Sequence, residues 1–218
     1  MSGRLLGPLR DLLVPPTCAS CGVGVHAGDA HRFCDACLAE FPPLPIAHRR
    51  LADVTQVLSC SAFDGLLSLL IQRLKYEREL ALARPLGELL VQKALAHDLE
   101  PDLVVPMPIS RPRQVERGFD HAWLLSAAVA EALGAPRVAA LHREHRPAQV
   151  GLPKAERREN LAQAFWVAPE APSLTGRTVL LIDDVITTGA TAEEAARSLR
   201  EAGASSVDVL TLAVALQP

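Results

Sequence analysis

The stretch that decides the fold reads TVLLIDDVITTGAT and occupies residues 178–191. Its first part, 178–182, is an apolar, partly β-branched run of the kind that forms a buried strand. A helix is expected over 191–202, with Thr191 and Glu194 at the spacing of a capping box, and another strand over 206–215. A strand, a loop, a helix and a strand in succession make a βαβ unit, which predicts a parallel sheet.

The rest of the chain after residue 50 alternates in the same way. Apolar patterns predict strands over 57–63 and 102–106 and helices over 66–76, 84–96 and 122–133, the last closed by Gly134. Charged residues dominate 142–163, where we expect a long mobile loop that runs into a helical turn. Together these patterns predict an α/β fold with a parallel sheet.

The loop after the strand at 178–182 has the chemistry of a sugar-phosphate site. Ligands of open α/β sheets bind at the carboxyl ends of the strands. Residues 187–191 would open the helix, where free N–H groups and the helix dipole favour an anion, and Gly189 permits close approach of a phosphate. Asp183 and Asp184, expected at the end of the strand, could accept hydrogen bonds from ribose hydroxyls or hold Mg²⁺ through water. They could also be ordinary turn residues ahead of a helix cap.

Residues 179–191 closely resemble the phosphoribosyl-pyrophosphate motif of type I phosphoribosyltransferases. The match extends to 104–108, to Arg117-Gly118-Phe119, to 149–160 and to two pairs of cysteines near the N-terminus. In that order these motifs are similar to the ComF family, also called the ComFC or GntX family, which joins a zinc module to such a domain. Asp120 and His121 depart from the family pattern, which has Asn and Gln there.

The resemblance implies a ligand, phosphoribosyl pyrophosphate with Mg²⁺, and assigns residues to it. The residues that it places against the ribose and phosphates are Asp183, Asp184, Val185, Thr187, Thr188, Gly189, Ala190, Thr191, Pro108, Ile109 and Ser110. Asp183, Asp184, Arg117 and Arg158 are the expected catalytic residues, with Arg158 on a loop over 143–160 that would exclude water. The arginines could instead form a solvated face. Lys75 either reaches the ligand or extends to the surface as a solvated lysine.

The cysteine pairs predict a metal site. Cys18 and Cys21 form one CxxC pair, and Cys34 and Cys37 form the second, twelve residues further on. Four thiolates can hold one Zn²⁺ tetrahedrally with no open position, so the zinc would be structural. A pair of disulfides is the alternative. We expect a zinc module and connector over 1–45 and a phosphoribosyltransferase-like domain over 46–218.

Composition limits the possible partners. Aromatic residues make up 4% of the chain and its net charge is −3, which disfavours tight autonomous binding of single-stranded nucleic acid. The sequence contains neither a signal peptide nor an apolar run long enough to span a membrane, so we expect a cytoplasmic protein.

Three functions are compatible with these features. The first is transfer of a phosphoribosyl group to an acceptor that the sequence does not identify. The second is a DNA-associated competence protein, binding single-stranded DNA or the DNA-uptake machinery without turnover. The third is a regulator that senses phosphoribosyl pyrophosphate. A fold alone does not choose among them.

Overall fold

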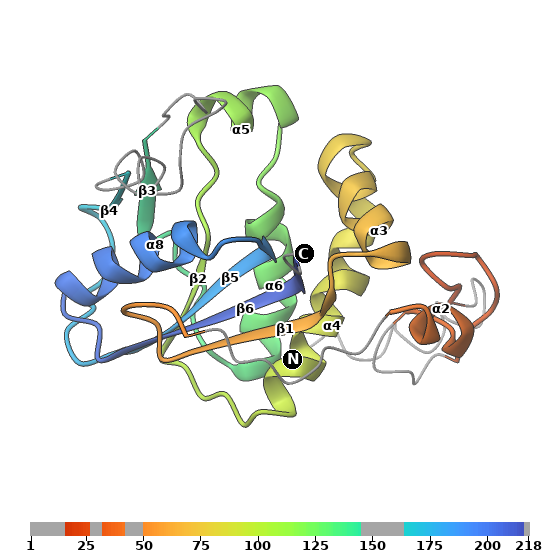
Figure 1. Ribbon diagram of the computed structural model, residues 1–218, viewed down its shortest axis with the longest axis horizontal. Coiled ribbons are helices and arrows are strands. Elements are labelled where there is room, and N and C mark those ends of the chain that lie inside the picture. The colour runs from red at the N-terminus through yellow and green to blue at the C-terminus, as the bar shows by residue number, and fades with distance from the viewer. Residues whose placement is uncertain (1–15, 27–31, 42–49, 145–163, 216–218) are drawn as a thin grey trace, which may run out of the picture.

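The computed structural model describes residues 16–26, 32–41, 50–144 and 164–215. At its centre is a parallel sheet of four strands in the order β1-β6-β5-β2 (Figure 1). Their bounds are Gln56–Ala62 for β1, Leu103–Pro106 for β2, Thr178–Ile186 for β5 and Ser206–Val214 for β6. The predicted α/β fold with a parallel sheet is therefore confirmed.

Helices cover the two faces of the sheet (Figure 1). One face carries α3 (Gly65–Tyr76), α4 (Ala83–Leu95) and α6 (His121–Leu133). The other carries α8 (Ala190–Glu201) and the antiparallel pair β3 (Leu141–Arg143) and β4 (Phe165–Val167). The short elements are α2 (Asp35–Ala39), η1 (Leu80–Leu82) and α5 (Arg111–Arg117).

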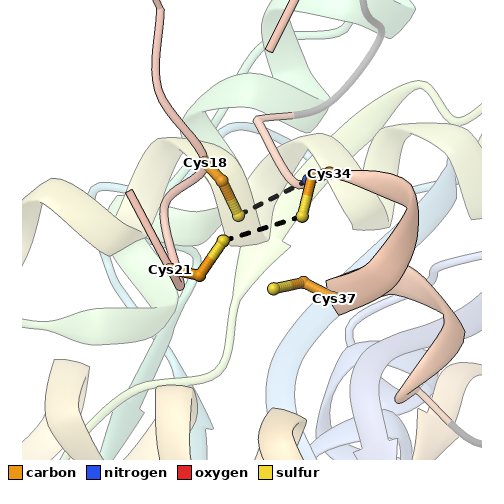
Figure 2. Close-up of side chains that lie close together, drawn as sticks. All are labelled: Cys18, Cys21, Cys34 and Cys37. Atoms are coloured by element: carbon orange, nitrogen blue, oxygen red, sulfur yellow. Dashed lines mark hydrogen bonds between the residues drawn. The ribbon is translucent and has the colours of Figure 1, made fainter. Parts of the chain in front are cut away.

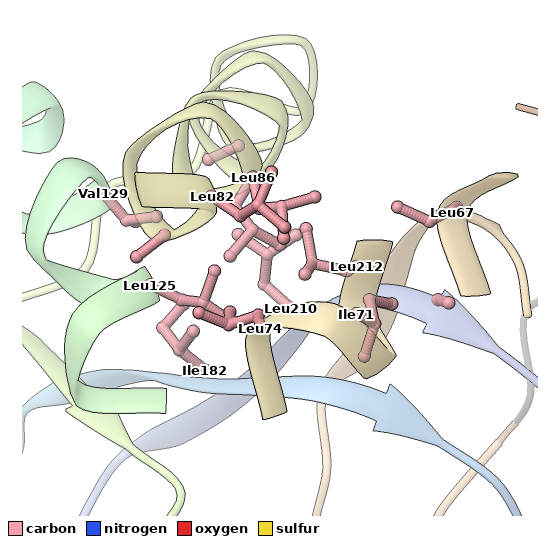
Figure 3. Close-up of a cluster of buried hydrophobic side chains, with 14 of the residues drawn as sticks. Leu67, Ile71, Leu74, Leu82, Leu86, Leu125, Val129, Ile182, Leu210 and Leu212 are labelled. Atoms are coloured by element: carbon pink, nitrogen blue, oxygen red, sulfur yellow. The ribbon is translucent and has the colours of Figure 1, made fainter. Parts of the chain in front are cut away.

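The alternation of side chains along β5 assigns each residue to a face. Leu180 and Ile182 belong to the core under α3, α4 and α6, where Ile182 lies near Leu125 and Leu74 (Figure 3). Leu181 belongs to the core under α8. The same alternation directs Asp184 toward the face of α3 and α6, and Asp183 toward the opposite face.

Two details of the decisive stretch differ from expectation. The strand β5 pairs with β6 as far as Ile186, so Asp183 and Asp184 lie within the strand and not at its end. The capping box was a wrong prediction. Gly189 is the N-cap of α8, with a left-handed φ of 86°, and Glu194 is paired with Arg197 by a hydrogen bond of 3.1 Å from Nε to Oε2.

The region that was predicted as a loop from residue 142 begins as a strand. Arg143 belongs to β3 and pairs with Phe165 of β4. Because Phe165 is distant in the sequence, no local pattern predicts this pairing. The helix α5 was also not predicted, because its seven residues include no buried side chain and hence no apolar pattern. Residues 145–163, which include most of the expected loop, lie outside the described residues.

The cysteine region packs against the main core. Phe33 is 1% exposed and meets Phe41 edge-on at 5.4 Å between ring centroids. Phe33 and Cys37 belong to the same buried cluster as Leu67 and Leu70 of α3. Among the described residues, no helix has both the length and the apolar character needed to cross a membrane.

Candidate functional site

The carboxyl ends of β2 and β5 border a cavity of about 210 Å³. The predicted site residues that line it are Asp183, Asp184, Val185, Thr187, Gly189, Thr191, Pro108, Ile109 and Arg117. The structure thus brings together residues that are up to 83 positions apart, from 108 to 191. This grouping follows from the pairing of β2 with β5, which places the chain after Pro106 beside the chain after Ile182.

Four of the predicted residues do not line this cavity within the described structure. Thr188 is exposed next to the cavity, and its Oγ1 accepts the N–H of Ala190 at 3.4 Å. Ser110 is 5% exposed and is the N-cap of α5, although its side chain does not cap the helix. Arg158 lies outside the described residues. Ser110 therefore lies at the start of α5 and does not line the cavity. Thr188 and Ala190 belong to the loop over 187–191, whose other residues line the cavity.

This loop presents the start of α8 to the cavity. Gly189 is buried and left-handed, and the helix that it opens is twelve residues long. The first N–H groups of such a helix have no partners within it and carry the positive end of its dipole. Thr187 and Thr191 add hydroxyls beside them. The arrangement can bind a phosphate dianion.

Asp184 is held by contacts within the protein. It is 4% exposed, and its Oδ1 accepts the N–H of Val185 at 2.7 Å. Its Oδ2 forms an ion pair with the ammonium of Lys75 at the end of α3. The same oxygen lies 3.4 Å from Nε2 of His121, at the start of α6. One carboxylate therefore joins β5 to two helices.

His121 has a defined tautomer. The guanidinium of Arg117, which can only donate, lies 3.2 Å from Nδ1 of His121. Nδ1 must then accept, so the ring proton is on Nε2, facing Asp184. Burial, together with the charges of Lys75, Arg117 and Arg113, lowers the pKa of His121 to about 3. The ring is neutral at physiological pH, and its Nε2 faces the carboxylate at 3.4 Å without forming a hydrogen bond to it.

Asp183 faces the other way and has more freedom. Its Oδ1 accepts the N–H of Asp184 at 2.8 Å, and Oδ2 accepts no hydrogen bond from any of the described residues. Burial raises the pKa of Asp183 to about 6, against the opposing charges of Lys75 and Arg143. Asp183 is half-buried at the wall of the cavity, and its second oxygen is available. Such a carboxylate can accept a hydrogen bond from a sugar hydroxyl or bind a cation.

Several residues of the cavity were not assigned to it from the sequence. Lys75 is 17% exposed in its side chain, which contradicts the alternative of a solvated surface lysine. Burial lowers the pKa of Lys75 to about 8, and the charge of Asp183 acts against that change. The sequence analysis named His121 only as a departure from the family pattern and expected Arg143 in the loop, whereas both residues line the cavity. The Leu-Lys-Tyr run at 74–76 was the signal that pointed to Lys75.

A second, basic cleft adjoins the first. It has a volume of about 410 Å³ and lies between the end of α3 and α5, lined by Lys75, Tyr76, Arg78, Arg113, Glu116 and Arg117. The guanidinium carbon of Arg117 lies 5.1 Å from the centroid of the Tyr76 ring, which is 68% exposed. Four cationic side chains and an exposed aromatic ring suit a ligand with several negative charges.

A magnesium ion is compatible with the acids of the cavity. One nitrogen of His121 and one oxygen each from Asp183 and Asp184 lie within 4.8 Å of one another. Asp184 already forms an ion pair with Lys75, and Nδ1 of His121 faces the guanidinium of Arg117. The available oxygen of Asp183 is therefore the ligand that fits Mg²⁺, directly or through water.

The four N-terminal cysteines converge on one point (Figure 2). Their sulfur atoms all lie within 4.8 Å of one another, with 3.7 Å between Cys21 and Cys34. None of them forms a disulfide. Burial raises the pKa of Cys18, but backbone N–H groups, including that of Cys34 at 3.4 Å from Sγ, bring it down to about 6. Converging sulfurs that receive N–H donors are compatible with zinc.

Comparisons with known proteins agree with this geometry. Residues 121–217 match the family model described as the phosphoribosyl transferase domain. Competence protein F of Haemophilus influenzae is 32% identical over 219 residues, which cover 97% of this chain and 90% of that protein. The DNA utilization protein YhgH of Salmonella typhi is 32% identical over 207 residues, covering 89% and 82%.

Similarity to solved structures is weaker. Glutamine phosphoribosylpyrophosphate amidotransferase from B. subtilis, complexed with ADP and GMP, is 23% identical with a TM-score of 0.42. The aligned part covers 61% of this chain and 26% of that one.

Proposed function

Because the chain belongs to the ComF family and has a phosphoribosyltransferase-type fold, we propose that its cavity binds phosphoribosyl pyrophosphate together with Mg²⁺. The observation that carries the proposal is the position of Gly189. It opens α8 with a left-handed residue and lines the same cavity as the half-buried carboxylate of Asp183, so that a phosphate and a sugar hydroxyl have partners in one cavity. The 5-phosphate would lie on residues 187–191 and the ribose against Asp183.

The pyrophosphate would lie on the basic side of the cavity. Pro108 and Ile109 line that side, and Arg113 and Arg117 supply the positive charge. Guanidinium groups suit this task because they bind phosphate oxygens in pairs and remain charged. We assign Arg158, and the part of the segment 143–160 that follows β3, to a cover that excludes water from this side, as the family resemblance implies.

Transfer would follow from positioning. A nucleophile attacks C1 of the ribose, the bond from C1 to the pyrophosphate oxygen breaks, and pyrophosphate leaves with the electron pair. Mg²⁺, when bound, would neutralise part of the negative charge on the leaving pyrophosphate. Arg117 and Arg113 add positive charge on the same side, while Asp183 orients the sugar ring. The chain provides little proton transfer of its own, so any proton of the acceptor leaves with solvent.

The N-terminal cysteines would hold one structural zinc ion. Four thiolates leave no open position on the metal, and a module over 1–45 is too small to fold on a core of its own. A cytoplasmic location, where thiols stay reduced, belongs to the same proposal. The module would then support the phosphoribosyltransferase-like domain over 46–218.

Calorimetric titration tests the ligand. Phosphoribosyl pyrophosphate is titrated into the zinc-loaded protein with and without Mg²⁺, and into the Asp183→Asn variant. We expect Mg²⁺-dependent binding in the wild type and a loss of at least tenfold in the variant, since hydrogen bonds to charged groups contribute about 1.5–3 kcal/mol. Asp98→Asn is the control, because this acid is exposed and its φ of 49° suits asparagine equally. Equal affinity in Asp183→Asn and Asp98→Asn would remove the proposed site.

A second candidate function rests on the basic cleft. Lys75, Arg78, Arg113 and Arg117 surround the exposed ring of Tyr76, and the relatives carry the names competence protein and DNA utilization protein. We propose single-stranded DNA as the alternative ligand of this cleft. Its affinity should fall steeply with salt, because phosphate contacts release counterions. Arg78→Ala should weaken DNA binding and leave the affinity for phosphoribosyl pyrophosphate in place, because Arg78 lines the basic cleft but not the first cavity.

A further inference from the structure

We propose that His121 is a positioning residue for the pyrophosphate group, because its ring nitrogen holds the guanidinium of Arg117 where the cavity meets the basic cleft. This inference rests on the proposed function, which assigns Arg117 to the pyrophosphate. It goes further by naming the residue that keeps this guanidinium in place. It predicts that His121 affects the contribution of the pyrophosphate to binding and not that of the 5-phosphate.

The backbone that carries Arg117 is not held by the core. Arg117 is the last residue of α5, a seven-residue helix that has no buried side chain and lies apart from the sheet (Figure 1). The residue that follows, Gly118, is exposed and left-handed, with a φ of 79°. A long side chain on such a support has many rotamers, and fixing one of them costs free energy when a ligand binds.

Two contacts restrict the guanidinium of Arg117. Its carbon lies 5.1 Å from the centroid of the exposed Tyr76 ring, and one of its terminal nitrogens lies 3.2 Å from Nδ1 of His121. A cation over an exposed ring gains little and has a broad range of positions, whereas a hydrogen bond has a direction. His121 therefore supplies the contact that orients the guanidinium.

His121 is itself held firmly. It is 8% exposed and is the first residue of α6. The start of that helix is fixed by Asp120, whose side chain accepts the N–H of Trp123 at 3.0 Å, and Leu125 of the next turn belongs to the main core. The accepting nitrogen thus has a set position beside the cavity, which His121 also lines.

The contact leaves the positive charge of Arg117 available to a ligand. Burial keeps the pKa of His121 well below its usual range, so Nδ1 is a neutral acceptor at physiological pH. A carboxylate in the same place would form an ion pair and offset the charge. The guanidinium has five N–H donors, and the contact with His121 occupies one terminal nitrogen. The other donors would face the pyrophosphate, on the side where Arg113 adds a second charge.

The test compares two ligands that share the 5-phosphate. Phosphoribosyl pyrophosphate and ribose 5-phosphate are titrated by calorimetry into the full zinc-loaded chain with Mg²⁺, and the ratio of their affinities measures what the pyrophosphate adds. We expect Arg117→Met to lower this ratio at least tenfold, because charged hydrogen bonds are lost. His121→Leu should lower it roughly threefold to tenfold, the cost of ordering one long side chain. A purely structural role of His121 would weaken both ligands equally, and an unchanged ratio would overturn the inference.

Two further variants test whether His121 acts through Arg117. In His121→Asn the amide oxygen is attached to the same side-chain carbon, Cγ, as Nδ1 of histidine, so it can still accept from Arg117 and should retain most of the ratio. In the Arg117→Met background, His121→Leu should lower the ratio no further, because the contact is already absent. A further loss there, or a ratio in His121→Asn as low as in His121→Leu, would overturn the inference. His97→Leu is the matched control, since His97 is exposed and does not line the cavity.

Failure of the inference and failure of the proposed function give different results. If the wild type binds neither ligand, the proposed phosphate site is refuted and the inference with it. If the wild type binds both ligands with equal affinity, the pyrophosphate has no partner in the protein, and the inference is overturned while the phosphate site stands. If Arg117→Met lowers the ratio and His121→Leu does not, the inference alone is overturned.

Discussion

Leu51 packs directly over Gly189, although the two residues are 138 positions apart. A Cβ built on Gly189 would lie 2.6 Å from Cδ2 of Leu51, closer than carbon atoms can approach. The neighbouring Ala52 donates its N–H to Oε1 of Glu193 in α8 at 3.1 Å. The segment before β1 is thus attached to the turn that opens the phosphate-type loop.

Gly189→Ala should therefore cost stability for two reasons, the overlap with Leu51 and the left-handed φ of 86°. We expect a loss of about 1–3 kcal/mol in urea unfolding. Adding Leu51→Ala removes the overlap but not the backbone strain, so the double variant should lose less from the glycine change than the wild type does. A Gly189→Ala protein as stable as the wild type would contradict this packing.

The buried ion pair predicts strong coupling between Lys75 and Asp184. Asp184→Asn leaves the ammonium of Lys75 without its partner and should destabilise the protein by about 3–5 kcal/mol. Asp184→Asn combined with Lys75→Met should recover most of that loss. The free energies of unfolding of the four proteins form a double-mutant cycle. Additive effects in the cycle would mean that the two groups do not interact.

Asp183 should weaken the fold at neutral pH. Its pKa rises from 3.8 to about 6 on folding, mainly through burial, so the folded state binds the proton more tightly than the unfolded state. Stability falls as the pH rises between these two values and stays lower above them. Asp183→Asn should gain about 1–3 kcal/mol at pH 7 and nothing below pH 3.8. Thermal unfolding at several pH values checks this, and a gain that does not depend on pH would count against it.

Removal of metal from the cysteine cluster should lower the melting temperature. Phe33 is 1% exposed and packs with α3, so loss of the cysteine geometry uncovers part of that core. We expect Cys37→Ala to lose bound zinc and to melt at a lower temperature. Cys60→Ala is the matched control, because Cys60 lies in β1 outside the cluster and should keep the zinc content unchanged. Full zinc content in Cys37→Ala would contradict the four-sulfur site.

The sequence predicted those parts of the site that depend on neighbouring residues. The order of strand, acids, threonines and glycine in 178–191 locates a sugar-phosphate loop, because all these groups lie within one βα connection. The helix and strand boundaries were close to those observed for the same reason. In 66–76 and 206–215, for example, the apolar period is complete within the element.

Contacts between distant elements were the part that the sequence did not predict. Lys75 and His121 meet at Asp184 only because α3 ends, and α6 begins, over the carboxyl end of β5. That register depends on the packing of helices on the sheet, which no local pattern encodes. The length of β5 was likewise determined by its partner, since pairing with β6 extends the strand as far as Ile186.

The two adjacent acids of the motif do different work, and this affects how genetic results on them are interpreted. Asp184 joins α3, α6 and β5, whereas Asp183 keeps an oxygen toward the cavity. A loss-of-function phenotype from a change at Asp184 therefore reports on the abundance of folded protein before it reports on any ligand. Only Asp183 gives an allele whose phenotype separates recognition from folding.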